Sequence, residues 1–142
     1  MDLVLEKGAD AGDTEALKRN PEKLVELTIT EKFSFDADTL NDIQLGAAKM
    51  RFKELVDKVP ALRRMAEDQG VSEITSFDDI AKLLFPHTLY KSYPLSVLEQ
   101  GRFDRLTKWL DSLTAYDLSG LDASHCDNID DWLDFIDANS EV

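Results

Sequence analysis

The chain has 142 residues, of which 43% are hydrophobic and 32% charged, and its formal net charge at pH 7 is −13. This length favours a single domain that can bury a core of its own. The charge excludes nucleic-acid binding through the overall electrostatic field, because neutralising phosphates requires Lys and Arg, and it disfavours binding to an anionic membrane surface.

The sequence carries no sign of export or membrane insertion. No apolar run approaches the roughly 20 residues of a transmembrane helix, and residues 1–7 lack the basic start and apolar core of a secretory signal. The single cysteine, Cys126, leaves no internal disulfide to form. These features predict a reduced, cytoplasmic protein.

The negative charge is unevenly distributed along the chain. Residues 1–48 carry 11 acidic and 5 basic side chains, and residues 111–142 carry 9 acidic side chains and no basic one. Residues 49–110 have a small basic excess, with 11 basic against 9 acidic side chains. The last segment is therefore a candidate acidic surface.

The first third of the chain predicts an arm followed by short helices. Residues 1–12 have little hydrophobic periodicity and predict a loose N-terminal arm, whereas residues 13–142 predict a helical domain. A first helix is expected from about residue 13, and Pro21 is expected to begin a second helical piece. Residues 28–35 alternate apolar and polar side chains, which predicts a short extended piece.

The strongest helical pattern extends from about residue 38 to residue 58. Its apolar residues recur on one face, its acidic residues lie near the start and its basic residues near the end, an order that suits the helix dipole. Pro60 is expected to begin a short helix that Gly70 ends as a left-handed cap. Ser76 and Asp79 form a variant of the capping box, which predicts the start of a further helix.

An irregular stretch bracketed by Pro86 and Pro94 interrupts the helical pattern. Each proline biases the residue before it toward extended backbone, and large apolar side chains are concentrated here. Residues 85–94 are therefore predicted to form an irregular central loop that packs across a surface. Its candidate interaction residues are Tyr90, Lys91 and Tyr93.

Three helical segments are expected after this loop. The first is a single turn that Gly101 ends, the second lies over about residues 103–113, and the third over about residues 128–137. The third has an apolar side formed by Ile129, Trp132, Leu133 and Ile136. The predicted fold class is therefore all-α, mostly helical.

The last helix also has a row of carboxylates opposite its apolar side. The row consists of Asp127, Asp130, Asp131, Asp134 and Asp137. At a rise of about 1.5 Å per residue it places roughly one charge per 4 Å, close to the phosphate spacing of about 3.4 Å in a DNA strand. Two interpretations stay open: the solvated face of an ordinary amphipathic helix, and an acidic surface that imitates nucleic acid and docks on a basic partner.

The sequence lacks the common motifs for catalysis, cofactors and metals. Its six glycines are scattered, so neither GxGxxG nor a phosphate-binding P-loop occurs. His87, His125 and Cys126 lack the spacing of a zinc site, and the acidic segment around Asp130 lacks the glycine of a calcium loop. We therefore expect no catalytic, cofactor-binding or metal site in this chain.

Six short motifs follow one another after Leu40. They are Ile43-Gln44-Leu45, Val59-Pro60-Ala61-Leu62-Arg63-Arg64, Glu67-Asp68-Gln69-Gly70-Val71, Ser76-Phe77-Asp78-Asp79-Ile80-Ala81-Lys82-Leu83-Leu84, Lys91-Ser92-Tyr93-Pro94 and Ile136-Asp137-Ala138-Asn139-Ser140-Glu141-Val142. In this order and spacing the chain resembles the N-terminal region of the phenylacetate–CoA ligase and acyl-protein synthetase branch of adenylate-forming enzymes. It departs from that family at Phe85-Pro86-His87, where Leu-Pro is common, and it stops where the glycine-rich phosphate loop would begin.

The resemblance implies a helical N-terminal segment of an ATP-dependent acyl-adenylating ligase, inactive in isolation. ATP, Mg²⁺ and CoA are the cofactors implied for a full-length parent, and the missing adenylation core is the implied partner. No catalytic residue is carried over, because the nucleotide-binding motifs lie outside this chain. The loop around Tyr90, Lys91 and Tyr93 would face the core.

A segment that lies on a larger core should also leave an exposed apolar patch. Its expected contributors are Tyr93, Trp109, Trp132 and Phe135. The alternative hypothesis is a complete, small acidic interaction protein, such as an inhibitor that mimics nucleic acid. In that case Asp127, Asp130, Asp131 and Asp134 would bind a basic partner, with Trp132 on the same helix.

Overall fold

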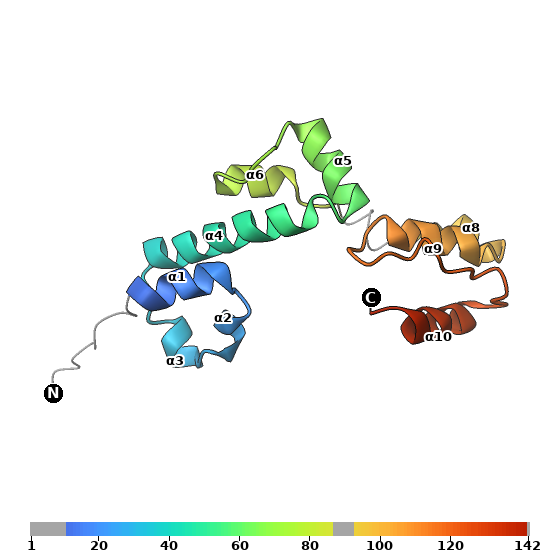
Figure 1. The fold of residues 1–142 in the computed structure, drawn as a ribbon, viewed down its shortest axis with the longest axis horizontal. Helices are drawn as coiled ribbons and strands as arrows, with labels where there is room; N and C mark the ends of the chain where they lie inside the picture. The colour runs from blue at the N-terminus through green and yellow to red at the C-terminus, as the bar shows by residue number, and fades with distance from the viewer. Residues whose placement is uncertain (1–10, 87–92, 142) are drawn as a thin grey trace. The chain divides into compact units, whose positions relative to one another are not determined.

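The structure is a computed structural model that describes residues 11–86 and 93–141 (Figure 1). Every regular element in these ranges is a helix, which confirms the all-α class. Where the sequence favours one domain, the chain divides into two compact units. Unit 1 comprises Met1–Lys53 and Glu73–Ile80, and unit 2 comprises Glu54–Ser72 and Ala81–Val142.

Unit 1 begins with three helices and most of a long fourth one. These are α1 (Ala11–Arg19), α2 (Lys23–Glu26), α3 (Ile29–Lys32) and α4 (Ala37–Leu55). Its buried apolar residues are Leu17 on α1, Ile43 and Phe52 on α4, and Ile74. Gly46 lets α1 approach α4 closely, since a Cβ atom there would lie 2.8 Å from Cγ of Lys18.

The extended piece predicted near residues 28–35 is wrong, because this segment forms α3. Thr28 is the N-cap: its hydroxyl accepts a hydrogen bond from the amide of Glu31 at 3.2 Å. The Glu31 carboxylate in turn accepts one from the amide of Thr28 at 2.8 Å. This reciprocal capping box satisfies two backbone donors and favours the helical turn over the strand that the alternation indicated.

The predicted helix at residues 38–58 is observed as α4 and ends earlier, at Leu55. The next helix, α5 (Pro60–Gln69), has the predicted boundaries: Pro60 is its first residue and Gly70 ends it at φ 65°. Glycine reaches this left-handed conformation without a steric penalty. Helix α6 (Phe77–Lys82) follows the predicted capping sequence.

Unit 2 contains α8 (Leu95–Glu99), α9 (Phe103–Asp111) and α10 (Ile129–Asn139), with α8 packed against α9. Its core joins six residues from α9, α10 and the segment between them: Phe103, Leu106, Ala123, Cys126, Trp132 and Ile136. Helix α5 belongs to the same unit, and the amide of Ala61 donates to the carbonyl of Ser112 at 2.9 Å.

A buried polar contact fixes α10 to α9. Nε1 of Trp132 donates to Oγ1 of Thr107 at 2.9 Å, and the Thr107 hydroxyl donates to the carbonyl of Phe103 at 2.9 Å. Both side chains are almost fully buried, with exposed fractions of 6% and 3%. The indole N–H therefore enters the core with its hydrogen bond satisfied.

None of the helices in residues 11–86 and 93–141 combines the length and hydropathy needed to cross a membrane.

We expect Thr107→Val to lower the free energy of unfolding by about 1–3 kcal/mol, because it leaves the buried indole N–H of Trp132 unpaired. Urea denaturation followed by fluorescence measures this loss. Trp132→Phe combined with Thr107→Val should cost less than the sum of the single changes, by about 1 kcal/mol. Thr30→Val, at an exposed threonine of α3, is the control; strictly additive costs would contradict the coupling.

Candidate functional site

Helix α10 begins with a reciprocal cap that uses one carboxylate of the acidic row. Oδ1 of Asn128 accepts a hydrogen bond from the amide of Asp131 at 3.0 Å. The Asp131 carboxylate accepts from Nδ2 of Asn128 at 2.8 Å and from the amide of Asp127 at 3.3 Å. Asp131 therefore stabilises the start of the helix. Neither interpretation of the acidic row, as a solvated face or as a docking surface, assigned this role to it.

The other members of the row are displayed on the surface. Asp127, Asp130, Asp134 and Asp137 are all exposed. An ordinary solvated helix face and a docking surface for a basic partner would both look like this. The nucleic-acid mimic hypothesis therefore stays a prediction.

Trp132 and Leu133 differ from their expected positions. The prediction that Trp132 contributes to an exposed patch is wrong, since its ring lies in the core and its N–H is bonded to Thr107. Leu133, expected on the apolar side, has an exposed fraction of 48%. Trp109 and Phe135 are partly buried against the core. Phe135 also meets the ring of His125 edge-on, with centroids 4.8 Å apart.

Large apolar side chains lie exposed on both sides of the central loop. Tyr90 and Lys91 lie outside the described residues, whereas Tyr93 is 47% exposed, as expected for a patch residue. Leu84 before the loop and Leu95 after it are 68% and 57% exposed. All three described side chains belong to unit 2. We refer to Leu84, Tyr93 and Leu95 together as the loop-flanking surface, a grouping by their positions in the sequence around the loop.

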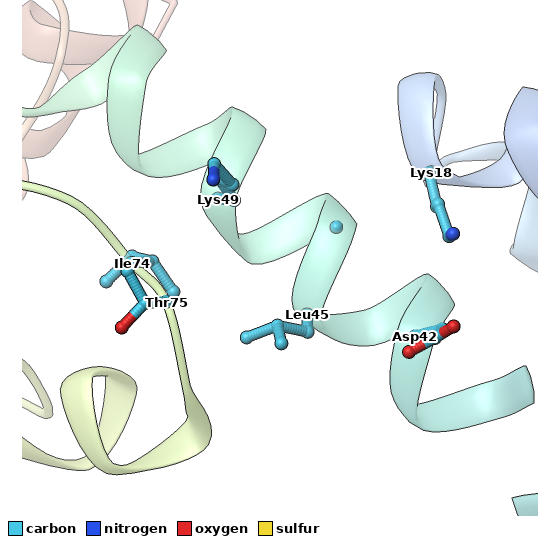
Figure 2. A pocket seen from close by; sticks show the side chains of 7 residues that line it. Lys18, Asp42, Leu45, Lys49, Ile74 and Thr75 are labelled. Carbon is cyan, nitrogen blue, oxygen red and sulfur yellow. The ribbon is translucent and has the colours of Figure 1, made fainter. Parts of the chain in front are cut away.

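Unit 1 has an open hollow of about 280 Å³ around α4 (Figure 2). It is lined by Lys18, Asp42, Leu45, Gly46, Lys49, Ile74 and Thr75. Both lysines are engaged, Lys18 with Glu15 at 3.0 Å and Lys49 with Glu73 at 2.6 Å. Sequence reasoning missed this hollow because its walls come from three separate segments. Its paired charges leave no free cationic group for an anion.

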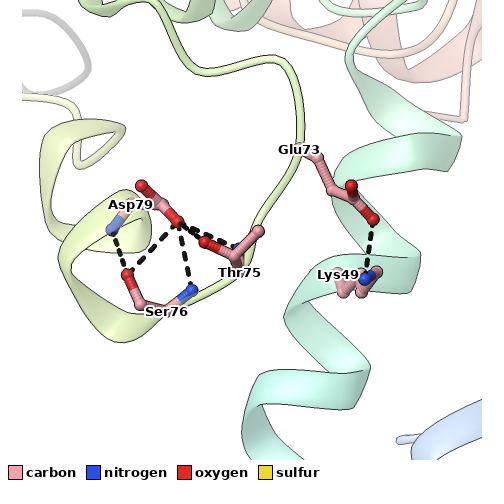
Figure 3. Close-up of polar contacts among 5 residues, drawn as sticks. All are labelled: Lys49, Glu73, Thr75, Ser76 and Asp79. Atoms are coloured by element: carbon pink, nitrogen blue, oxygen red, sulfur yellow. Dashed lines mark hydrogen bonds and ion pairs between the residues drawn. The ribbon is translucent and has the colours of Figure 1, made fainter.

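A network of hydrogen bonds holds the start of α6, next to the Lys49–Glu73 ion pair (Figure 3). The carboxylate of Asp79 accepts from the hydroxyl of Thr75 at 2.7 Å and from its amide at 2.9 Å. It also accepts from the amide and hydroxyl of Ser76, at 3.1 and 3.2 Å. The Thr75 bonds, followed by those of Ser76, hold the pKa of Asp79 well below its usual 3.8. The predicted capping box is confirmed, with Thr75 as an additional donor.

The described residues contain no group of three His, Cys, Asp or Glu side chains that could hold a metal ion. Burial, followed by the charges of Asp131, Asp127 and Asp122, raises the pKa of the Cys126 thiol, which opposes a role as nucleophile. Gly70 and Gly101 have positive φ of 65° and 63° at helix ends. Neither is part of a glycine-rich loop that could bind phosphate.

No family model, curated protein or solved structure matches this chain. The likeness to adenylate-forming enzymes therefore rests on the sequence motifs alone.

Asp79→Asn should lower the thermal midpoint of unfolding at pH 7. Because folding depresses the pKa of Asp79, its ionised carboxylate stabilises the protein fully above about pH 3.8, and this contribution is lost as the pH falls through the folded-state pKa. The difference between wild type and variant should therefore shrink below about pH 3.8. Asp78→Asn removes the same charge in the same helical turn and is the matched control; an equal effect would contradict the role of the hydrogen bonds.

Asn128→Ala should destabilise unit 2 by about 1 kcal/mol, because it removes the N-cap of α10. Asp134→Ala on the same helix should change stability by less than about 0.5 kcal/mol. Urea titration of both variants makes the comparison. Equal losses would show that the exposed row, and not the cap, stabilises the helix.

Proposed function

We propose that this chain is the helical N-terminal segment of an adenylate-forming acyl ligase or synthetase, and that it packs against and shapes the adenylation core. On this proposal the chain is inactive alone. The adenylation core would bind ATP, Mg²⁺ and CoA and carry out the chemistry. This chain would contribute a surface that packs against the core and shapes it. The motifs quoted above are the source of the family assignment.

The loop-flanking surface is the observation that carries the proposal. Leu84, Tyr93 and Leu95 remain exposed although unit 2 has a core of its own. Single exposed apolar residues are common, but three around one loop favour a surface that another protein covers. The resemblance to adenylate-forming enzymes implies that the loop around Tyr90, Lys91 and Tyr93 would face the core.

The motif residues have structural roles that suit a scaffold. Pro60 begins α5, Gly70 ends it, Ser76 caps α6 and Pro94 precedes α8. Each role depends on backbone geometry or on a local hydrogen bond. Motif residues that lie at helix boundaries support a shaping function more than a chemical one.

The test uses the longer polypeptide in which this chain is joined to an adenylation core. Its activity is measured as pyrophosphate exchange into ATP that depends on an acyl substrate. We expect Leu84→Ser with Leu95→Ser to lower this activity, or the affinity of a separately expressed core for the chain, by about tenfold or more, because apolar contacts with the core are lost.

The matched control is Tyr116→Ser, at an aromatic residue that is 46% exposed elsewhere in unit 2. Circular dichroism of the isolated variants should equal that of the wild type, because the changed side chains are exposed. The proposal fails if no core with a Ser/Thr-Gly-rich phosphate loop is encoded with this chain. It fails also if the isolated chain adenylates an acyl substrate unaided.

A further inference from the structure

Unit 2 has a hollow of its own, of about 270 Å³, beside α9. One wall comes from residues 104–111 of α9 and the other from residues 118–122, and we name the space between them the α9 hollow. We propose that the α9 hollow binds a free α-amino acid with an aliphatic side chain. The inference does not rest on the proposed function.

The buried part of the lining is mainly apolar and belongs to the core of unit 2. Thr107 and Leu118 are 3% and 1% exposed, and Leu121 is partly buried against the core. The Thr107 hydroxyl is already bonded to the carbonyl of Phe103 and to the indole of Trp132. An aliphatic group placed against this floor is removed from water, which favours binding.

Hydrogen bonds hold the two walls together. Oδ1 of Asp111 accepts from the amide of Leu118 at 2.7 Å. The amide of Leu121 donates to the carbonyl of Leu118 at 3.0 Å and closes the turn between them. Oδ1 of Asp122 accepts from the amide of Ser124 at 3.0 Å. The α9 hollow is therefore largely formed before a ligand enters, which lowers the entropic cost of binding.

The rim of the α9 hollow carries both signs of charge. Asp104, Lys108 and Asp111 are neighbours on one face of α9, and Asp122 comes from the other wall. Neither the side chain of Asp104 nor that of Lys108 forms a hydrogen bond or ion pair with another described residue. In the hollow around α4, by contrast, both lysines are engaged. The rim of the α9 hollow thus offers an ammonium group and carboxylates to a ligand.

These charges select a zwitterion among small ligands. A metal ion is not expected, because the carboxylates of Asp104, Asp111 and Asp122 are not grouped as ligands of one ion. Lys108 would repel an amine, and the three aspartates would repel a carboxylic acid. An α-amino acid carries adjacent ammonium and carboxylate groups, which match the order of charges at Asp104, Lys108 and Asp111.

The size of the α9 hollow restricts the ligand further. Its volume lies just below the roughly 300–1,000 Å³ of typical ligand pockets, so it suits a small molecule. An aliphatic side chain on the amino acid can cover the floor formed by Thr107, Leu118 and Leu121. Leucine has all three parts: an ammonium group, a carboxylate and a branched aliphatic side chain.

An NMR titration of the full 142-residue chain with leucine tests the inference. We expect a dissociation constant on the order of 1 mM, because the ligand is small and its charged contacts are exposed to solvent. Amide shifts should be confined to residues 103–111 and 118–124. Three matched ligands each lack one part of leucine: isocaproate lacks the ammonium group, isoamylamine the carboxylate and glycine the side chain. Each should bind about fivefold more weakly or worse.

Substitutions in the rim separate this site from a general attraction to an acidic chain. Asp104→Asn with Lys108→Gln leaves the net charge unchanged and should weaken leucine binding by about tenfold. Asp134→Asn removes an exposed carboxylate of α10 outside the hollow and should leave binding unchanged. Because the changed side chains are exposed, circular dichroism of both variants should match the wild type.

Two outcomes overturn the inference. One is the absence of amide shifts at leucine concentrations about ten times the expected dissociation constant, where about 90% of a real site would be occupied. The other is equal binding of isoamylamine and leucine, because it would show that the acidic rim attracts any amine.

Discussion

The hydrogen bond between the indole of Trp132 and the hydroxyl of Thr107 determines what the C-terminal helix shows to solvent. An indole can be buried at little cost only where its N–H finds an acceptor, and Thr107 supplies that acceptor from α9. With Trp132 and Ile136 turned inward, the carboxylates of Asp130 and Asp134 must face water. Phe135 is accommodated on one flank against His125, whereas Leu133 on the other flank stays half exposed. The acidic and apolar character of this surface is thus a consequence of a contact made inside the core.

Some of the acidic side chains of the protein stabilise the first turns of helices. Glu31, Asp79 and Asp131 each lie three residues after a polar capping residue, and each carboxylate accepts a hydrogen bond from a backbone amide at its helix start. Such contacts satisfy donors that an α-helix leaves unpaired and place negative charge at the positive end of its dipole. A strongly acidic composition is therefore compatible with an ordinary helical scaffold, and it does not by itself require a basic partner.

The features that could be predicted from sequence are those set by local chemistry. Pro60, Gly70, Ser76 and Asn128 marked helix boundaries because each acts on backbone groups within a few residues. The strand near residues 28–35 was predicted wrongly because apolar alternation was given more weight than the Thr28–Glu31 pair. The burial of Trp132, the exposure of Leu133, the hollow around α4 and the division into two units depend on contacts between distant segments. No local pattern in a single sequence encodes them.

The order in which segments contribute to the two units has a consequence for synthesis on the ribosome. Unit 1 takes its last piece from residues 73–80, after part of unit 2 has already been made. Ile74, one of its buried residues, is therefore added only after α5 has emerged. A single cut after Lys53 leaves all of unit 2 but keeps residues 73–80 of unit 1, and a cut after Ile80 leaves all of unit 1 but keeps residues 54–72 of unit 2. Neither unit is therefore obtained free of a segment of the other.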